Sequence, residues 1–185
     1  FRERGLQPEA AVALCLCAGL VSDTLNLTSP TTTDVDRDML LWLSGLAEVD
    51  ADEFAEAFFA SGSLLLHADA KATVGTDRKE FNEDGVFLSL SQVEETSFKG
   101  LSKRQEELVE ELERLRHEHR YELCAILVTD IRRHDSVLLA VGREELLCKL
   151  PFTRSGVNEF SAPGVVSRKK QLFPAVCEAI KLRSD

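Results

Sequence analysis

Hydrophobic and polar positions follow two different patterns along the chain, and the change falls within its first half. Residues 8–20 are small and apolar with the character of a helix, and in residues 35–46 and 51–60 apolar residues recur every three or four positions, which is the period of a helix that is buried on one side. Asp34 is placed to cap the second of these helices. Because no strand-like alternation separates them, we expect residues 1–62 to form one helical unit.

Strand-like and helix-like segments alternate in the rest of the chain. Residues 86–93 (VFLSLSQV) show the period of a strand packed on one face, and residues 102–120 indicate a charged helix with leucines along one side. Further short apolar runs, interpreted as strands, lie at 122–129, 137–141 and 146–150. This order predicts an α/β unit over residues 63–185, with a mixed sheet flanked by helices.

Composition narrows the range of partners. The 22 Lys and Arg against 32 Asp and Glu give a net charge of -10, which argues against a general nucleic-acid surface. No apolar run reaches the roughly 18–20 residues that span a bilayer, so we expect no membrane partner. The five cysteines lie in apolar segments without a CxxC pair, which favours buried reduced thiols in a cytoplasmic protein. The chain opens without methionine, and we interpret it as a piece of a longer protein.

A basic cluster near the C-terminus is the most unusual local feature of this acidic chain. Arg168, Lys169 and Lys170 follow residues 164–166 (GVV), which we interpret as the end of a buried strand, and a helix is predicted over 171–180. Cations between a strand end and a helix N-terminus suit a phosphate, because side-chain charge and free backbone N–H groups point the same way. The alternative is a solvated surface patch.

Two further residues could contribute to a site. Asp23 leaves the end of the first predicted helix, where it could cap the next segment or bind a hard cation. Lys79 lies in residues 77–81 (DRKEF), ahead of the first predicted strand. It could be a plain surface lysine or a second arm toward an anion held by Arg168 and Lys169. The sequence contains no GxSxG, P-loop, HExxH or Gly-rich dinucleotide motif.

Four passages, taken together, carry a family resemblance. They are residues 21–24 (VSDT) with 29–33 (SPTTT), 77–81 (DRKEF), 128–131 (VTDI) with 135–136 (DS), and 164–171 (GVVSRKKQ). In this order they resemble the C-terminal half of family II, manganese-dependent inorganic pyrophosphatases of the DHH phosphoesterase superfamily. The resemblance implies that residues 1–62 are the C-terminal helical part of a metal-binding DHH domain. It also implies that residues 63–185 are the substrate-binding domain that accompanies DHH domains.

The resemblance assigns expected roles to four residues. Asp23 matches the last metal-ligand aspartate of the DHH domain, and Lys79, Arg168 and Lys169 match substrate-binding cations. The implied cofactor is Mn²⁺ or Co²⁺, with Mg²⁺ accompanying the pyrophosphate substrate. No catalytic residue is expected within these 185 residues.

The implied activity is hydrolysis of pyrophosphate to two phosphates by metal-activated water, with this chain supplying the phosphate clamp and one metal ligand. The His-x-x-x-Asp-x-Asp segment and the Asp-His-His triplet of that family are absent from the sequence. We therefore expect the chain alone to be inactive and to need an N-terminal DHH domain; a homodimer is consistent with the resemblance. Two alternatives stay open. One is another DHH-superfamily phosphoesterase acting on polyphosphate or nucleotides, and the other is a non-catalytic phosphate-binding or regulatory domain.

Overall fold

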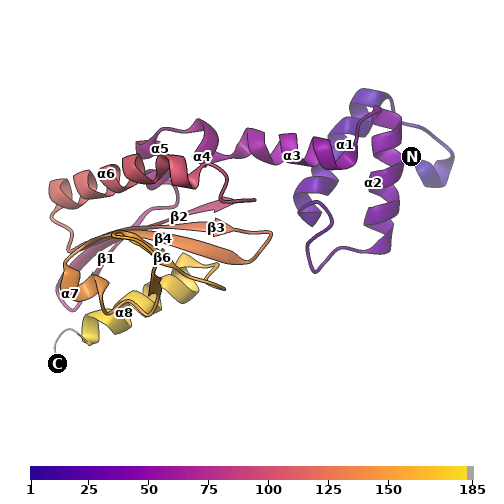
Figure 1. Ribbon diagram of the computed structural model, residues 1–185. Helices are drawn as coiled ribbons and strands as arrows, with labels where there is room; N and C mark the ends of the chain where they lie inside the picture. The colour runs from indigo at the N-terminus through magenta and orange to yellow at the C-terminus, as the bar shows by residue number, and fades with distance from the viewer. Residues whose placement is uncertain (183–185) are drawn as a thin grey trace. The chain divides into compact units, whose positions relative to one another are not determined.

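The computed structural model describes residues 1–182, which divide into two compact units. The first unit, Phe1–Gly62, is helical, and the second, which starts at Ser63, is built on a β-sheet (Figure 1). We call them the helical unit and the sheet unit. Each buries its own hydrophobic residues, the helical unit in one cluster and the sheet unit in two. In the described part of the chain, no helix is long and apolar enough to cross a membrane.

The helical unit consists of three α-helices that follow a short 3₁₀ helix. Ala13, Cys17 and Val21 of the first helix are fully buried, and their spacing of four residues places them on one helix face. This face packs against Leu40 and Leu43 of the second helix. The elements of the unit are η1 (Arg2–Arg4), α1 (Ala10–Thr24), α2 (Asp34–Ala47) and α3 (Ala51–Gly62).

Two helix ends in this unit differ from the prediction. α1 continues to Thr24, whose Oγ1 donates to the Leu20 carbonyl at 2.7 Å, so Asp23 lies inside the last helical turn rather than beyond it. α2 is capped by Thr33 and not by Asp34. Thr33 accepts the Asp36 N–H at 3.4 Å while the Asp36 carboxylate accepts the Thr33 N–H at 2.8 Å, a reciprocal capping box.

The sheet unit holds a six-stranded mixed sheet in the order β1-β2-β3-β4-β6-β5. β2 and β3 are parallel, and all other neighbouring strands are antiparallel. This helix-flanked mixed sheet confirms the predicted α/β fold class. The strands are β1 (Lys79–Glu83), β2 (Val86–Glu95), β3 (Leu123–Asp130), β4 (Asp135–Gly142), β5 (Thr153–Arg154) and β6 (Glu159–Ser161).

Helices cover both faces of this sheet (Figure 1). One face packs against α4 (Leu64–His67), α5 (Ala70–Gly75) and α6 (Leu101–His119). The other packs against α7 (Glu144–Leu147), the π-helix η2 (Arg168–Leu172) and α8 (Phe173–Lys181). We call the first the α6 face and the second the α8 face.

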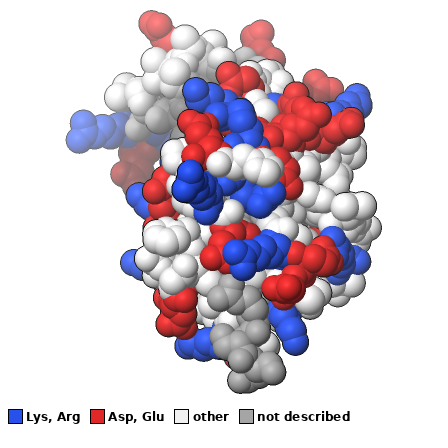
Figure 2. All heavy atoms as spheres, turned by 90° about the vertical axis from the view of Figure 1, so that its left-hand side faces the viewer, with Lys and Arg blue, Asp and Glu red and all other residues white. Residues whose placement is uncertain are grey.

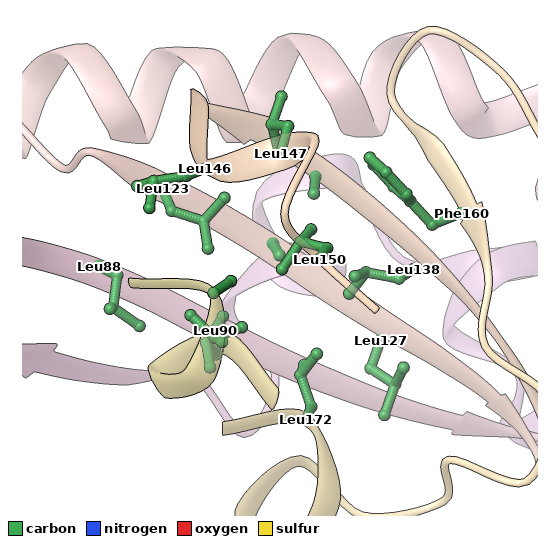
Figure 3. Packing of buried hydrophobic residues seen from close by; sticks show 14 of the residues in the cluster. Leu88, Leu90, Leu123, Leu127, Leu138, Leu146, Leu147, Leu150, Phe160 and Leu172 are labelled. Atoms are coloured by element: carbon green, nitrogen blue, oxygen red, sulfur yellow. The ribbon is translucent and has the colours of Figure 1, made fainter. Parts of the chain in front are cut away.

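Alternate residues of the central strands fill the two cores of the sheet unit. On the α8 face, a layer of leucines and Phe160 packs between the sheet and the segments that cover it (Figure 3). On the α6 face, Ile126 and Val128 of β3 pack with Leu108 and Leu112 of α6. Every residue of β3 is buried, because both faces of this central strand are covered. The leucines labelled on the α8 face are Leu88, Leu90, Leu123, Leu127, Leu138, Leu146, Leu147, Leu150 and Leu172.

Two strand predictions in this unit are wrong. Residues 146–150 belong to α7 and the turn after it, and Leu146, Leu147 and Leu150 all reach the same core, which is a helical spacing. Residues 164–166 are a loop, because β6 ends at Ser161 and Gly164 adopts a left-handed φ of 75°.

The edge strand β1 was not predicted, because its sequence KEFNE is mostly polar and shows no hydrophobic alternation. An edge strand has a neighbouring strand on one side only and is exposed to solvent on the other. It pairs with β2 through a tight turn at Asp84 and Gly85, which adopt φ values of 49° and 77°. An Asp-Gly pair is a recognised hairpin signal.

All five cysteines are free, but Cys15 and Cys148 are exposed rather than buried.

Candidate anion-binding site

Polar side chains replace leucines at one end of the α8 face. On β2, Leu88 and Leu90 point into the core of this face, and the next residue of the same alternation is Gln92. On β3 the corresponding position after Leu127 is Thr129, which pairs directly with Ser136 of β4. Gln92, Thr129 and Ser136 are all buried. We call these three residues the polar row.

The polar row binds the loop that leads to Arg168. Gln92 Nε2 donates to the Val166 carbonyl at 3.0 Å and to Thr129 Oγ1 at 3.1 Å, and Gln92 Oε1 accepts the Arg168 N–H at 2.8 Å. Ser136 Oγ donates to the Val165 carbonyl at 2.6 Å. Backbone groups that leave water need such partners. The loop is therefore attached to the sheet through hydrogen bonds on both sides of Ser167.

The same loop is also closed on itself. Gln171 Oε1 accepts the Val166 N–H at 2.9 Å, and Gln171 Nε2 donates to the Gly164 carbonyl at 2.8 Å. Ser167 Oγ accepts the Lys170 N–H at 3.2 Å and caps the π-helix. Gly164 supplies the positive φ that the turn requires. These bonds give the basic cluster a fixed backbone.

Arg168 is buried, although its position in a run of three cations predicted a solvated or ligand-facing side chain. It is 8% exposed, and its Nη1 lies 3.2 Å from Oδ1 of Asp77. Among the described residues, Nε and Nη1 of Arg168 have no hydrogen-bond partner. Leaving donors of a buried charged group unused is unfavourable. This guanidinium therefore has hydrogen-bonding capacity that the described residues leave unsatisfied.

The edge strand β1 places Lys79 on the same face. Lys79 pairs with Leu90 and Phe81 pairs with Leu88, and directly opposed residues of neighbouring strands point to the same side of a sheet. Leu88 and Leu90 point to the α8 face, so Lys79 and Phe81 lie on that side of the sheet as well, where Phe81 packs against the core and Lys79 stays exposed. Phe81 stacks on Phe173 with 4.1 Å between the ring centroids. β1 thus lies against the segment that follows the basic cluster.

The structure therefore brings Lys79, Arg168 and Lys169 into one neighbourhood, with Asp77 in contact with Arg168. Lys79 and Lys169 are exposed. Neither forms an ion pair with any of the described residues. Several arginines elsewhere in the sheet unit are paired, among them Arg104, Arg114, Arg116, Arg143 and Arg154. Figure 2 shows a face of the molecule on which acidic and basic side chains are intermingled.

Arg78 fixes the start of β1 from the opposite face. Its Nη1 donates to Ser89 Oγ and to the Tyr121 hydroxyl, both at 3.3 Å, and its Nη2 pairs with Glu80 at 2.9 Å. A hydrogen bond with Tyr121, together with the charge of Arg78, holds the pKa of Glu80 below its ordinary value. These contacts fix the backbone on either side of Arg78, which carries Asp77 and Lys79.

Asp23 lies in the helical unit, exposed in the last turn of α1. It lines a cavity of about 580 Å³ whose other walls include Leu16, Leu20 and Trp42. Within residues 1–182, no group of three or more His, Cys, Asp or Glu side chains is arranged to hold a metal ion. The carboxylate of Asp23 can therefore supply one ligand but does not make a metal site with its described neighbours.

Sequence reasoning missed Asp77 and the polar row as parts of this site. A signal for the polar row does exist, because Gln92 continues the alternation of Leu88 and Leu90 where another leucine is expected. A polar residue at such a position needs a buried partner. Asp77 gives no comparable signal, since its contact with Arg168 depends on the pairing of an edge strand.

Comparison with known proteins gives consistent matches. Residues 56–179 match the family model described as the DHHA2 domain. The "Manganese-dependent inorganic pyrophosphatase" of Bacillus subtilis is 30% identical over 181 residues, which is 97% of this chain and 59% of that protein. The "Probable manganese-dependent inorganic pyrophosphatase" of Lactobacillus helveticus is 32% identical over 185 residues, again 59% of that protein. The chain thus spans about three fifths of the length of these relatives.

A solved structure shares the fold. It is described as "Crystal structure of Methanococcus jannaschii putative family II inorganic pyrophosphatase", and it superposes with a TM-score of 0.61 at 28% sequence identity. The match covers 95% of this chain and 58% of that one. Sequence and structure comparisons therefore agree on the same group of proteins.

Proposed function

The chain belongs to the DHHA2 domain family, and we propose that it is the substrate-binding part of a manganese-dependent inorganic pyrophosphatase. In this proposal Lys79, Arg168 and Lys169 hold the phosphates of pyrophosphate. The observation that carries the proposal is the buried Arg168 guanidinium. Its Nε and Nη1 have no hydrogen-bond partner among the described residues, and it lies near two exposed lysines.

The chemistry of the three cations suits a pyrophosphate. A guanidinium offers a planar fork that matches two phosphate oxygens, while a lysine ammonium acts as a compact point charge. Catalysis of phosphoryl transfer depends mainly on positioning and on neutralising charge on the phosphates. A backbone fixed by Gln92, Ser136 and Gln171 supplies such positioning without rearrangement of the loop.

We propose that residues 1–62 belong to a metal-binding DHH domain and that Asp23 is one ligand of its manganese site. A carboxylate oxygen is a donor that Mn²⁺ accepts readily. The described residues do not complete a site, so the other ligands would come from chain outside them. When bound, the metal would supply an activated water, and Mg²⁺ would accompany the substrate. Co²⁺ is expected to substitute for Mn²⁺.

A nucleotide substrate is less well supported than pyrophosphate. Base recognition commonly uses aromatic side chains on which a base can stack. The aromatic pair next to the basic cluster is Phe81 and Phe173, and these rings stack on each other and pack against the core of the α8 face. Both rings are therefore in contact with other parts of the protein.

We place the protein in the cytoplasm because its five cysteines are all free.

The test is to replace each proposed cation in the intact protein that contains this chain. Arg168→Ala and Lys169→Ala are expected to lower pyrophosphate turnover by about 100-fold or more, because each removes a group that neutralises phosphate charge. Lys79→Ala should lower it by a smaller factor. Lys103→Ala, which removes an exposed lysine of α6, is the matched control and should leave turnover unchanged. Unchanged kinetics in the Arg168 and Lys169 variants would refute the proposal.

A further inference from the structure

Asp77 is the one described residue whose charge is paired with the Arg168 guanidinium. The two side chains differ sharply in exposure, since the side chain of Arg168 is 9% exposed and that of Asp77 is 55% exposed. Their closest atoms are 3.2 Å apart, yet Nε and Nη1 of Arg168 make no hydrogen bond within the described part of the chain. The carboxylate therefore balances the charge of the guanidinium without using its donors.

The backbone brings this carboxylate to Arg168 from a fixed turn. Asp77 adopts a left-handed φ of 42° between α5 and β1, a conformation that Asp and Asn tolerate better than most residues. On one side of the turn, the Val74 carbonyl accepts a hydrogen bond from Ser91 Oγ at 2.5 Å. On the other side, Arg78 is bonded to Ser89 and Tyr121. The turn is held at both ends, and the exposed carboxylate is the part that can move.

A carboxylate and a phosphate compete for the same guanidinium. Both are anionic oxygen acceptors that bind the planar fork of arginine. A phosphate that approached Arg168 with Asp77 still in contact would meet a negative charge within ion-pair distance, which opposes binding. Lys79 and Lys169 are exposed and can attract the phosphate before that contact is exchanged.

We propose that Asp77 is an internal counterion that occupies Arg168 in the ligand-free protein and is displaced by a phosphate of the substrate. This inference rests on the proposed function, because it takes Arg168 to be a phosphate-binding residue. Binding is then an exchange of one anion for another at the same cation. The reverse exchange helps a product phosphate to leave, since the Asp77 carboxylate replaces it at Arg168. Asp77 in this sense sets the affinity of the site rather than taking part in the chemistry.

The test measures the affinity of the intact protein for inorganic phosphate, which is not hydrolysed further, by titration calorimetry. Asp77→Asn keeps the shape of the side chain and the tolerance for positive φ but removes the charge. We expect it to bind phosphate about threefold to tenfold more tightly. Asp84→Asn is the matched control, because Asp84 is also exposed with a left-handed φ of 49°, at the other end of β1. It should leave the affinity unchanged within about twofold.

Further variants separate this inference from the proposed function. Asp77→Gly also tolerates positive φ and should show the same gain as Asp77→Asn, while Asp77→Asn placed in an Arg168→Ala background should show none. Weaker phosphate binding by Asp77→Asn would mean that Asp77 orients Arg168 and would overturn the exchange. A gain no larger than that of Asp84→Asn would overturn it too. If Arg168→Ala itself left phosphate affinity unchanged, the proposed function would fail instead.

Discussion

Two arginines on opposite faces of the sheet, Arg78 just before β1 and Arg168 in η2, have different surroundings. Arg78, on the α6 face, donates to Ser89 and Tyr121 and pairs with Glu80. Arg168, on the α8 face, is more deeply buried and contacts one exposed carboxylate. Its Nε and Nη1 lack hydrogen-bond partners in the described residues. Both arginines are charged and contact a carboxylate, but they differ in burial and in whether their side-chain donors have hydrogen-bond partners.

The comparison indicates how a structural arginine differs from one that we propose to bind a ligand. The partners of Arg78 are all parts of the folded chain, so its role is complete without a ligand. The backbone N–H of Arg168 donates to Gln92, and the loop around it is also hydrogen-bonded, whereas Nε and Nη1 of its guanidinium have no hydrogen-bond partner among the described residues. The polar row thus fixes the backbone position of Arg168 but supplies no hydrogen-bond acceptor for Nε and Nη1 of its side chain. A group that binds a ligand needs both properties, a position fixed by its neighbours and donors that remain available for the ligand.

The largest expected effect comes from removing the unsatisfied guanidinium. Arg168→Leu should weaken binding of inorganic phosphate by about 100-fold, because the planar donor fork is lost. Stability should stay the same or rise by about 1 kcal/mol, because a buried charge without hydrogen bonds is replaced by an apolar group. Calorimetry and urea unfolding measure the two quantities. A large loss of stability with affinity retained would break the comparison, since Arg168 would then be structural.

The next largest effect is expected at the polar row. Gln92→Leu leaves the Arg168 N–H and the Val166 carbonyl without their partner, which should lower the free energy of unfolding by about 2 kcal/mol. Phosphate affinity should fall about tenfold, because the loop that carries Arg168 loses its hydrogen bonds to Gln92 and keeps its side-chain bond to Ser136. Gln92→Glu keeps the acceptor for the Arg168 N–H and should be intermediate in both assays. Loss of stability with unchanged affinity would show that the row supports the fold alone.

Arg78 should show the reverse pattern, with a smaller total effect. Arg78→Leu removes the donors to Ser89 and Tyr121 and should lower the free energy of unfolding by about 1–2 kcal/mol. Phosphate affinity should change by less than about threefold, because Arg78 lies on the opposite face of β1. Arg132→Leu is the control, since Arg132 is exposed and its replacement should change stability by less than about 0.5 kcal/mol. A loss of affinity as large as that of Arg168→Leu would remove the distinction between the two arginines.

The sequence predicts the α/β architecture because its main elements have clear periods. The alternation over 86–93 and the charged helix over 102–120 correspond to β2 and α6. The run at 146–150 was assigned wrongly, because a short apolar run has no period that separates a strand from a helix. β1 was missed because an edge strand of polar residues has no hydrophobic pattern to detect.

For the candidate site, the sequence indicates which residue types are present but not which residues form hydrogen bonds or ion pairs with them. Arg168 and Lys169 stand out as cations in an acidic chain, and their role in binding stays a prediction. The partners of Arg168 come from distant segments, and its N–H bonds to Gln92 across 76 positions. The contact with Asp77 further requires that β1 pair with β2 in one register. Such contacts follow from the folded topology and carry no local sequence signal.

The smallest expected effect concerns the acid that pairs with Arg78. Because Tyr121 and Arg78 hold the pKa of Glu80 below its ordinary value of 4.5, the ionised carboxylate stabilises the folded state. This contribution is present above the pKa of the unfolded chain and is lost as the pH falls through the lower folded value. Since Glu80 is about half exposed, solvent screening limits it to a few tenths of a kcal/mol. Urea unfolding of the wild type and Glu80→Gln should differ most near neutral pH and converge as the pH falls below the folded pKa of Glu80. A difference that persisted at low pH would mean that the Glu80 charge does not support Arg78. The α6 face would then hold its arginine through Ser89 and Tyr121 alone.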